Sequence, residues 1–102
     1  MTAILSKAEL RQILKALRLA RRNGEISAEY CRDGESHSVC YWIDESYPES
    51  SHDDVLLAQC FFSNLFEPLQ REDGYYWWPR HEYLPRLIAL DLAILIAEEM
   101  LR

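Results

Sequence analysis

The sequence lacks the features of a secreted, disulfide-linked or membrane-spanning chain. Its three cysteines, Cys31, Cys40 and Cys60, are an odd number without CxxC spacing, which disfavours a disulfide framework and suits a reducing compartment. Its longest apolar run, 87–97, is eleven residues long and contains Asp91, whereas a membrane span needs about 18–20 apolar residues. Its first residues form too short an apolar patch for a signal peptide. We therefore expect a cytoplasmic protein without a membrane segment.

The sequence also lacks the motifs of common enzyme sites. No P-loop, GxGxxG, GxSxG or HExxH pattern is present. A candidate base, His52, and a candidate nucleophile, Cys60, are eight residues apart. That is about 12 Å along a helix and too far for contact. The most compact set of metal ligands, Cys31-x5-His37-x2-Cys40, fits no strong zinc pattern. We therefore predict that the chain is not an enzyme and binds neither metal nor cofactor.

What the sequence does contain is enough apolar material for one hydrophobic core. The chain has 102 residues, of which 49% are hydrophobic and 27% charged, as in an ordinary globular domain. No linker, internal repeat or low-complexity segment divides it. We predict a single domain over residues 1–102.

The first element predicted is a helix over about 6–22. Ser6 and Glu9 have the S-x-x-E spacing of a capping box, which satisfies backbone N–H groups at a helix start. Asn23-Gly24 tolerates the left-handed conformation that ends many helices. Apolar residues recur between these signals at helical spacing, namely Leu10, Ile13, Leu14, Leu17 and Ala20.

Alternating residues predict a β-hairpin after this helix. Apolar and polar residues alternate over 26–31 and over 38–43, and Asp33-Gly34 lies between the two runs. Further on, Ser51 and the acids after it predict a helix from about residue 52 that ends before Pro68. The predicted fold class is α+β, with three main helices packed on a small antiparallel hairpin or three-stranded sheet.

The end of the chain completes the predicted order α-β-β-α-β-α. The aromatic run 75–78 has high strand propensity and could add a third strand. Pro85 suits the first turn of a final helix, which is apolar almost all round from Leu87 to Leu101. Such a helix is either central in the fold or buried in a subunit interface, so a homodimer through it is compatible with the sequence.

Charge is segregated along the chain. Residues 1–24 carry six bases and one acid, whereas residues 25–102 carry five bases and sixteen acids. The acidic segment, residues 44–54, contains five acids and no base, and its local field could attract a basic partner. These acids are Asp44, Glu45, Glu49, Asp53 and Asp54. The basic row shares one face of the first predicted helix and consists of Lys7, Arg11, Lys15, Arg18 and Arg22.

Aromatic residues near the acids suggest a binding surface. Trp and Tyr dominate the hot spots of protein interfaces, and the candidates here are Trp42, Tyr47, Tyr75 and Trp77. The composition is similar to that of many immunity proteins, phage-encoded inhibitors and small adaptors, a likeness that covers no specific position. We predict an acidic protein-interaction module, an inhibitor, immunity or anti-defence protein, that binds a basic target such as a protein that handles nucleic acid. The alternative function is a nucleic-acid-associated regulator that binds phosphates with the basic row. The basic row could instead face the protein's own acids, in the same or a neighbouring subunit.

Overall fold

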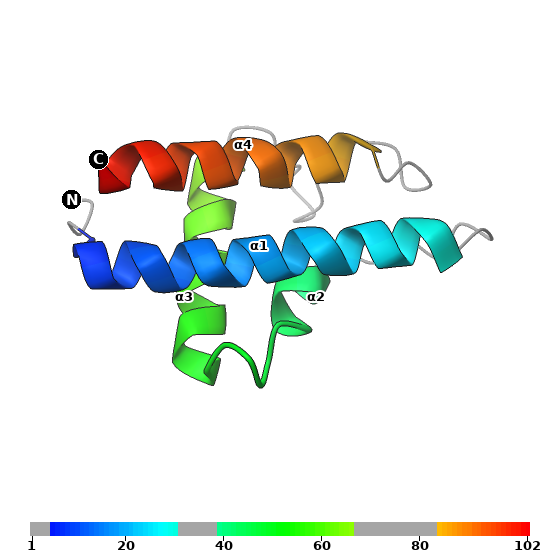
Figure 1. Cartoon of the computed structure of the whole chain (residues 1–102), viewed down its shortest axis with the longest axis horizontal. Coiled ribbons are helices and arrows are strands. Elements are labelled where there is room, and N and C mark those ends of the chain that lie inside the picture. The colour runs from blue at the N-terminus through cyan, green and yellow to red at the C-terminus, as the bar shows by residue number, and fades with distance from the viewer. Residues whose placement is uncertain (1–4, 31–38, 67–83) are drawn as a thin grey trace.

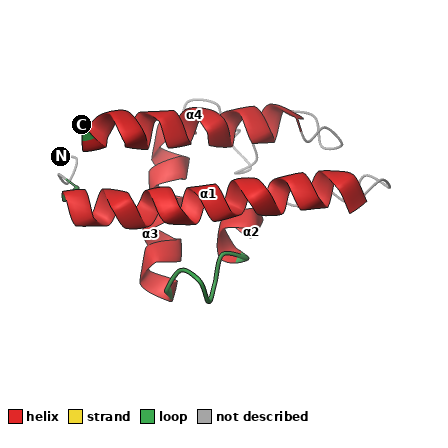
Figure 2. Cartoon of the chain, viewed as in Figure 1, coloured by secondary structure: helices red, strands yellow, loops and turns green. Residues whose placement is uncertain are grey.

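The computed structural model describes residues 5–30, 39–66 and 84–102, and every regular element among them is an α-helix (Figure 2). The helices are α1 (Lys7–Tyr30), α2 (Val39–Asp44), α3 (His52–Phe66) and α4 (Leu84–Leu101). Helix α1 is the centre of the arrangement: α4 runs alongside it, while α2 and α3 pack on another side (Figure 1). The predicted α+β class is therefore wrong, because both hairpin strands fall on residues that include helical segments. The predicted third strand, 75–78, lies outside the described residues.

The predicted start of α1 is confirmed, and the capping box forms. The Glu9 N–H donates to Ser6 Oγ at 3.1 Å, and the Ser6 N–H donates to Glu9 Oε1 at 3.0 Å. These hydrogen bonds lower the pKa of the Glu9 carboxyl, with the Ser6 backbone N–H as the largest cause. The carboxylate is the better acceptor, so the cap is complete above the ordinary Glu pKa of about 4.3 and is lost as the pH falls through the lowered folded-state value.

Removing the capping hydroxyl should weaken α1. We expect Ser6→Ala to lower the free energy of unfolding by about 1 kcal/mol, because the Glu9 N–H loses its acceptor at the helix start. Urea denaturation followed by far-UV circular dichroism at pH 7 measures the change. Gln12→Ala, at an exposed position within α1, is the control and should not destabilise the fold. Equal midpoints for wild type and Ser6→Ala would contradict a working cap.

Helix α1 does not end at Asn23-Gly24 but continues to Tyr30. Gly24 is buried, and a Cβ atom there would lie 2.9 Å from Leu87 Cδ2 and 2.9 Å from two ring atoms of Trp42. Gly24 has a helical backbone, and its lack of a side chain lets α1 pack closely against Trp42 of α2 and Leu87 of α4. Asn23 lies beside it and donates from Nδ2 to the Trp42 carbonyl at 3.1 Å. Both residues of the predicted helix stop are thus used to dock α2.

Helix α2 replaces the predicted second strand. The alternation of Val39, Tyr41 and Ile43 suggested a strand, but the buried residues are Val39, Trp42 and Ile43, which have the i, i+3, i+4 spacing of one helix face. A helix this short survives because its exposed carbonyl groups find partners. Its last four carbonyls accept from Glu45 N–H, Asn23 Nδ2, Ser46 N–H and Tyr47 N–H in turn.

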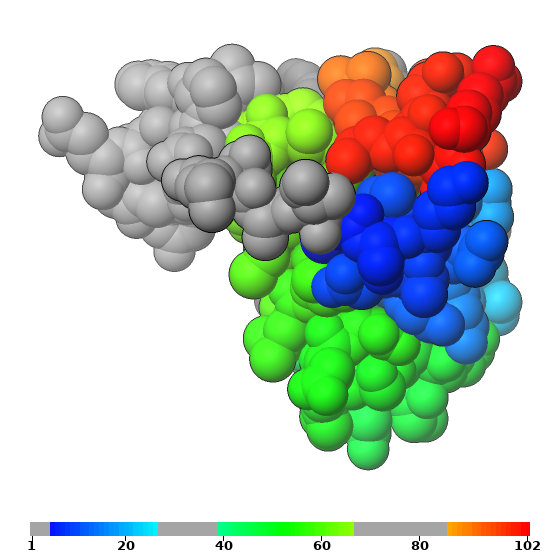
Figure 3. Space-filling view, turned by 90° about the vertical axis from the view of Figure 1, so that its left-hand side faces the viewer, coloured from blue at the N-terminus to red at the C-terminus, as the bar shows by residue number. Residues whose placement is uncertain are grey.

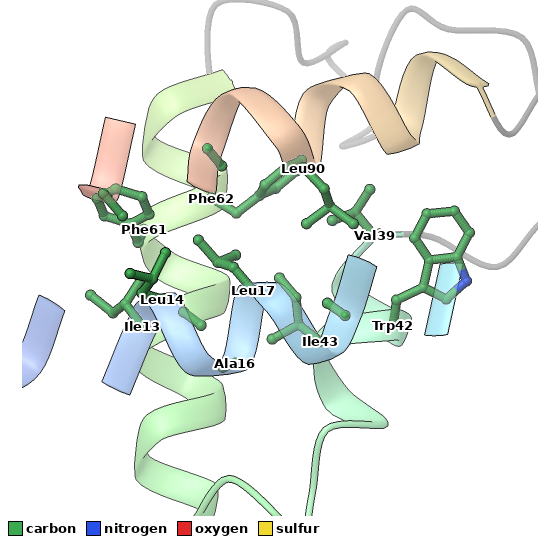
Figure 4. Close-up of a cluster of buried hydrophobic side chains, with 14 of the residues drawn as sticks. Ile13, Leu14, Ala16, Leu17, Val39, Trp42, Ile43, Phe61, Phe62 and Leu90 are labelled. Carbon is green, nitrogen blue, oxygen red and sulfur yellow. The ribbon is translucent and has the colours of Figure 1, made fainter. Parts of the chain in front are cut away.

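Helix α3 begins at His52, as predicted, and Ser51 caps it through a 3.2 Å bond from the Asp54 N–H to Ser51 Oγ. The predicted final helix is also confirmed as α4. It runs antiparallel to α1, since Arg18 pairs with Glu98 and Arg21 with Asp91. One core joins all four helices (Figure 4), and its fully buried side chains include Ile13, Leu17, Trp42, Ile43, Phe62 and Leu90.

Candidate interaction surfaces

The acidic segment runs from the last residue of α2, through the turn between α2 and α3, into the first turn of α3. Hydrogen bonds fix this turn to the rest of the fold. Ser46 and Ser50 are buried within it, and the Ser50 N–H donates to the Ser46 carbonyl at 2.9 Å. Ser46 Oγ donates to the Ile43 carbonyl at 2.6 Å. From α1, Lys15 Nζ donates to the Glu49 carbonyl at 2.8 Å. The carboxylates of the segment are therefore carried on an ordered turn.

The five carboxylates of the acidic segment face solvent and not partner cations in the part of the chain that the structure describes. Asp44, Glu45, Glu49 and Asp53 are exposed, and Asp54 is half-buried at the start of α3. Within the described part of the chain, none of the five forms an ion pair. Lys15 contacts the backbone of Glu49 and not a carboxylate. The segment therefore presents a concentrated negative field to solvent, as the sequence predicted from its composition.

An exposed aromatic pair lies within this negative field. The Tyr47 ring stacks on the His52 ring, with centroids 4.1 Å apart and an interplanar angle of 18°. Tyr47 is 48% exposed, so it offers one face and its hydroxyl to a partner. The sequence pointed to Tyr47 but not to His52, because their contact depends on the shape of the turn. Of the two predicted aromatic residues that the structure describes, Trp42 and Tyr47, Tyr47 is the one that reaches the surface.

The other predicted aromatic residues do not join this surface within the described structure. Trp42 is fully buried between α1, α2 and α4, where it contacts the position of Gly24. Trp42 is therefore a core residue, and the prediction that it binds a partner at the surface is wrong. Tyr75 and Trp77 lie outside the described residues.

The basic row is partly neutralised by the protein itself. Arg18 Nη2 lies 3.3 Å from Glu98 Oε2, and neighbouring Arg21 contacts both Asp91 at 2.8 Å and Glu25 at 2.7 Å. Partial burial is the largest single influence on the pKa of Arg21 and lowers it. The hydrogen bonds and charges of Asp91 and Glu25 together outweigh burial, so the pKa is raised. Three members of the row, Lys7, Arg11 and Arg22, are exposed and form no ion pair within the described part of the chain.

Helix α4 carries a second surface that the sequence did not define by residue. Its inner side is buried at Ala89, Leu90, Ala93 and Ala97. Its outer side exposes large apolar residues, which we call the α4 apolar face: Ile88, Leu92, Leu95 and Met100, each 47–59% exposed. A shallow hollow of about 330 Å³ opens at the C-terminal end of this face, lined by Leu95, Ile96, Glu99 and Met100. In the sequence, this face is indicated by the i, i+4, i+7 spacing of Ile88, Leu92 and Leu95, which places them on one side of a helix.

The thiols and the possible metal ligands of the described residues lie apart from these surfaces or are scattered. Cys40 and Cys60 are unpaired thiols. Burial raises the pKa of the Cys40 thiol, and nearby Cys60 adds to the rise, whereas a hydrogen bond with Ser63 opposes it. Within the described ranges, no three His, Cys, Asp or Glu side chains are grouped closely enough to hold a metal ion. Likewise, no helix in those ranges has the length and apolarity to cross a bilayer.

The fold and these surfaces define a small helical domain with one acidic and one apolar face. No family model, curated protein or solved structure matches the chain in comparisons with each. Function must therefore be argued from the surfaces themselves.

Proposed function

We propose that this protein is an acidic protein-interaction module of the cytoplasm, an inhibitor or immunity-type protein, whose acidic segment binds a basic surface of another protein. The observation that supports this proposal most strongly is that the five carboxylates of the acidic segment, four of them exposed, form no ion pair with any other described residue. Negative charge accelerates encounter with a basic partner and discriminates against acidic ones.

The Tyr47–His52 pair supplies the second component that a specific interface needs. Long-range charge sets the association rate, but affinity comes mainly from side chains that become desolvated in the centre of the contact. Tyr47 is half-exposed and already held by His52, so its immobilisation on binding costs little entropy. Arg and Lys of a partner would pair with the carboxylates around it, and an Arg could also stack on the Tyr47 ring.

Nucleic-acid binding through the basic row is less favoured by the geometry. Arg18 and Arg21 already pair with carboxylates of α4, and Lys15 donates to a backbone carbonyl. A polyanion that used Arg18 or Arg21 would have to displace Glu98 or Asp91, which leaves Lys7, Arg11 and Arg22 as the members of the row that form no ion pair with a described residue. It would also approach a chain with a formal net charge of −6, which repels phosphates at long range.

Charge reversal in the acidic segment tests the proposal. The variant Asp44→Lys/Glu45→Lys changes only residues outside α3, whereas Lys at Asp53 or Asp54 would oppose the dipole of that helix. The control Glu25→Lys/Glu98→Lys makes the same change in net charge on α1 and α4, away from the acidic segment and outside the residues that line the hollow of α4. Each tagged protein is used to capture partners from a lysate of the native host, with and without nuclease, and the partners are identified by mass spectrometry.

We expect a basic protein that wild type and control capture equally and that the Asp44→Lys/Glu45→Lys variant captures at least about tenfold less. Capture should survive nuclease and weaken as salt is raised, because exposed charges are screened. Equal capture by all three proteins, or no partner in any sample, would contradict the proposal. Loss of every partner after nuclease would favour the basic row and nucleic acid instead.

A further inference from the structure

We infer that the α4 apolar face is the interface of a homodimer in which two α4 helices pack antiparallel about a twofold axis at Leu92. Ile88, Leu92 and Leu95 are about half exposed along one side of α4, although they are large and apolar, and Met100 is similarly exposed at the C-terminal end of the helix. Helix α4 already packs on α1 through its other side. A row of exposed apolar residues on the free side of such a helix is typical of an interaction surface. The occupant assigned here is a second copy of this chain.

The shape of the face is self-complementary under this symmetry. In an isologous contact, residue i of one copy meets residue j of the other, and the reverse also holds. With Leu92 at the axis, Ile88 lies four residues before it and Ile96 four residues after it, each about 6 Å away along the helix. Ile88 of one copy therefore reaches the hollow of its partner, which Leu95, Ile96, Glu99 and Met100 line. A projecting side chain at one end fits a hollow at the other.

The charges bordering the face favour a second copy of the same chain. The carboxylates of α4 each have a cation within their own molecule: Arg21 for Asp91, Arg18 for Glu98 and Arg102 for Glu99. Two copies can therefore approach along α4 without placing unpaired carboxylates opposite one another, despite the net charge of −6. The axis also brings the two Arg21–Asp91 pairs to the same side, where opposite charges can alternate. An anionic lipid surface would instead face this row of acids.

The size of the face sets the strength of the dimer. Ile88 to Met100 spans about 18 Å, and a helix about 10 Å wide gives a footprint of roughly 200 Å² per copy. That is about a quarter of the roughly 800 Å² per partner in a standard interface. We therefore expect a weak dimer that forms only at high protein concentration.

The consequence of this dimer is a bivalent binding protein. The acidic segment lies on the side of the molecule away from α4, with α1 between them (Figures 1 and 3). Pairing through α4 would leave two acidic segments at opposite outer ends. A partner with two basic surfaces would then gain avidity even though each contact is unchanged. The dimer rests on the packing of α4 in this fold and not on the function proposed above.

Sedimentation equilibrium over a range of concentrations tests the interface. We expect the wild-type mass to rise from 12.1 kDa toward twice that value as concentration increases. Leu95→Lys should weaken dimerisation at least about tenfold, because a cation would enter the apolar contact. Leu56→Lys is a matched control, since Leu56 on α3 is also 59% exposed, and it should dimerise like wild type.

A cysteine at the axis tests the register. In a background with Cys31, Cys40 and Cys60 changed to Ser, Leu92→Cys should form a covalent dimer under a mild oxidant, because residues on the axis of packed helices come within disulfide reach. Leu56→Cys should remain monomeric. A monomeric wild type at all concentrations, equal dimerisation of Leu95→Lys, or no cross-link at Leu92→Cys would each overturn the inference. None of these results would affect capture through the acidic segment.

Discussion

Replacing Trp42 by alanine is expected to lower the free energy of unfolding by about 3–5 kcal/mol, the cost of truncating a large aromatic side chain in a core. The Trp42 indole is fully buried and joins α2 to α1 beneath Gly24. Small domains are stable by only about 5–15 kcal/mol, so this variant should be close to unfolding at room temperature. Had residues 38–43 formed the second strand of the predicted hairpin, Trp42 would have faced opposite to Ile43 and could have pointed to solvent.

Urea denaturation of the Trp42→Ala variant measures this loss. Tyr47→Ala removes an aromatic side chain that is 48% exposed and is the matched control. We expect that control to lose less than about 1 kcal/mol, because it gives up little more than its contact with His52. Similar losses for the two variants would contradict the burial of α2 against α1.

Replacing Gly24 by valine should destabilise the fold by about 3 kcal/mol through overpacking. Even its Cβ would lie 2.9 Å from Leu87 Cδ2 and from the Trp42 ring, closer than van der Waals contact allows, and two methyl groups would follow. Leu87 is a flexible side chain that can move, but the Trp42 ring is enclosed on all sides. Thermal and urea denaturation report the loss, and a Gly24→Val variant as stable as wild type would contradict the close helix contact.

The sign of the smaller change Gly24→Ala distinguishes close packing from helix propensity. Propensity alone predicts a gain of about 1 kcal/mol for alanine over glycine inside a helix. Overpacking costs about 1–3 kcal/mol, so the net result in the native background should be a loss. In a Trp42→Leu background the ring is absent, and Gly24→Ala should become neutral or stabilising. Additive effects of the two changes would show that these residues do not touch.

The elements that the sequence predicted correctly are those with local signals. The starts of α1 and α3 depend on Ser6 and Ser51, whose hydroxyls bond to N–H groups three residues away. The end of α1 and the identity of α2 depend on distant contacts: Gly24 with Leu87, and Asn23 and Gln59 with the carbonyls of α2. A six-residue window that suits a strand by alternation and a helix by i, i+3, i+4 spacing cannot decide between them.

The candidate surfaces divide in the same way. The acidic segment could be predicted because its charge density is a local property of residues 44–54. The neutralisation of Arg18 and Arg21 could not, because their partners Glu98 and Asp91 lie 80 and 70 residues away in the sequence. Residue type and closeness to the acids predict Trp42 at the surface, which is wrong because α2 places it in the core beside Ile43.

Both proposals rest on the helical course of the chain, because it places the acidic segment and α4 on opposite sides of α1. Backbone NMR chemical shifts of residues 26–30 and 39–44 test that course most directly. We predict helical Cα and C′ shifts at both segments, with sequential amide contacts that continue through Gly24. Extended-chain shifts at these residues, with cross-strand contacts between 26–31 and 38–43, would contradict the fold and both surfaces built on it.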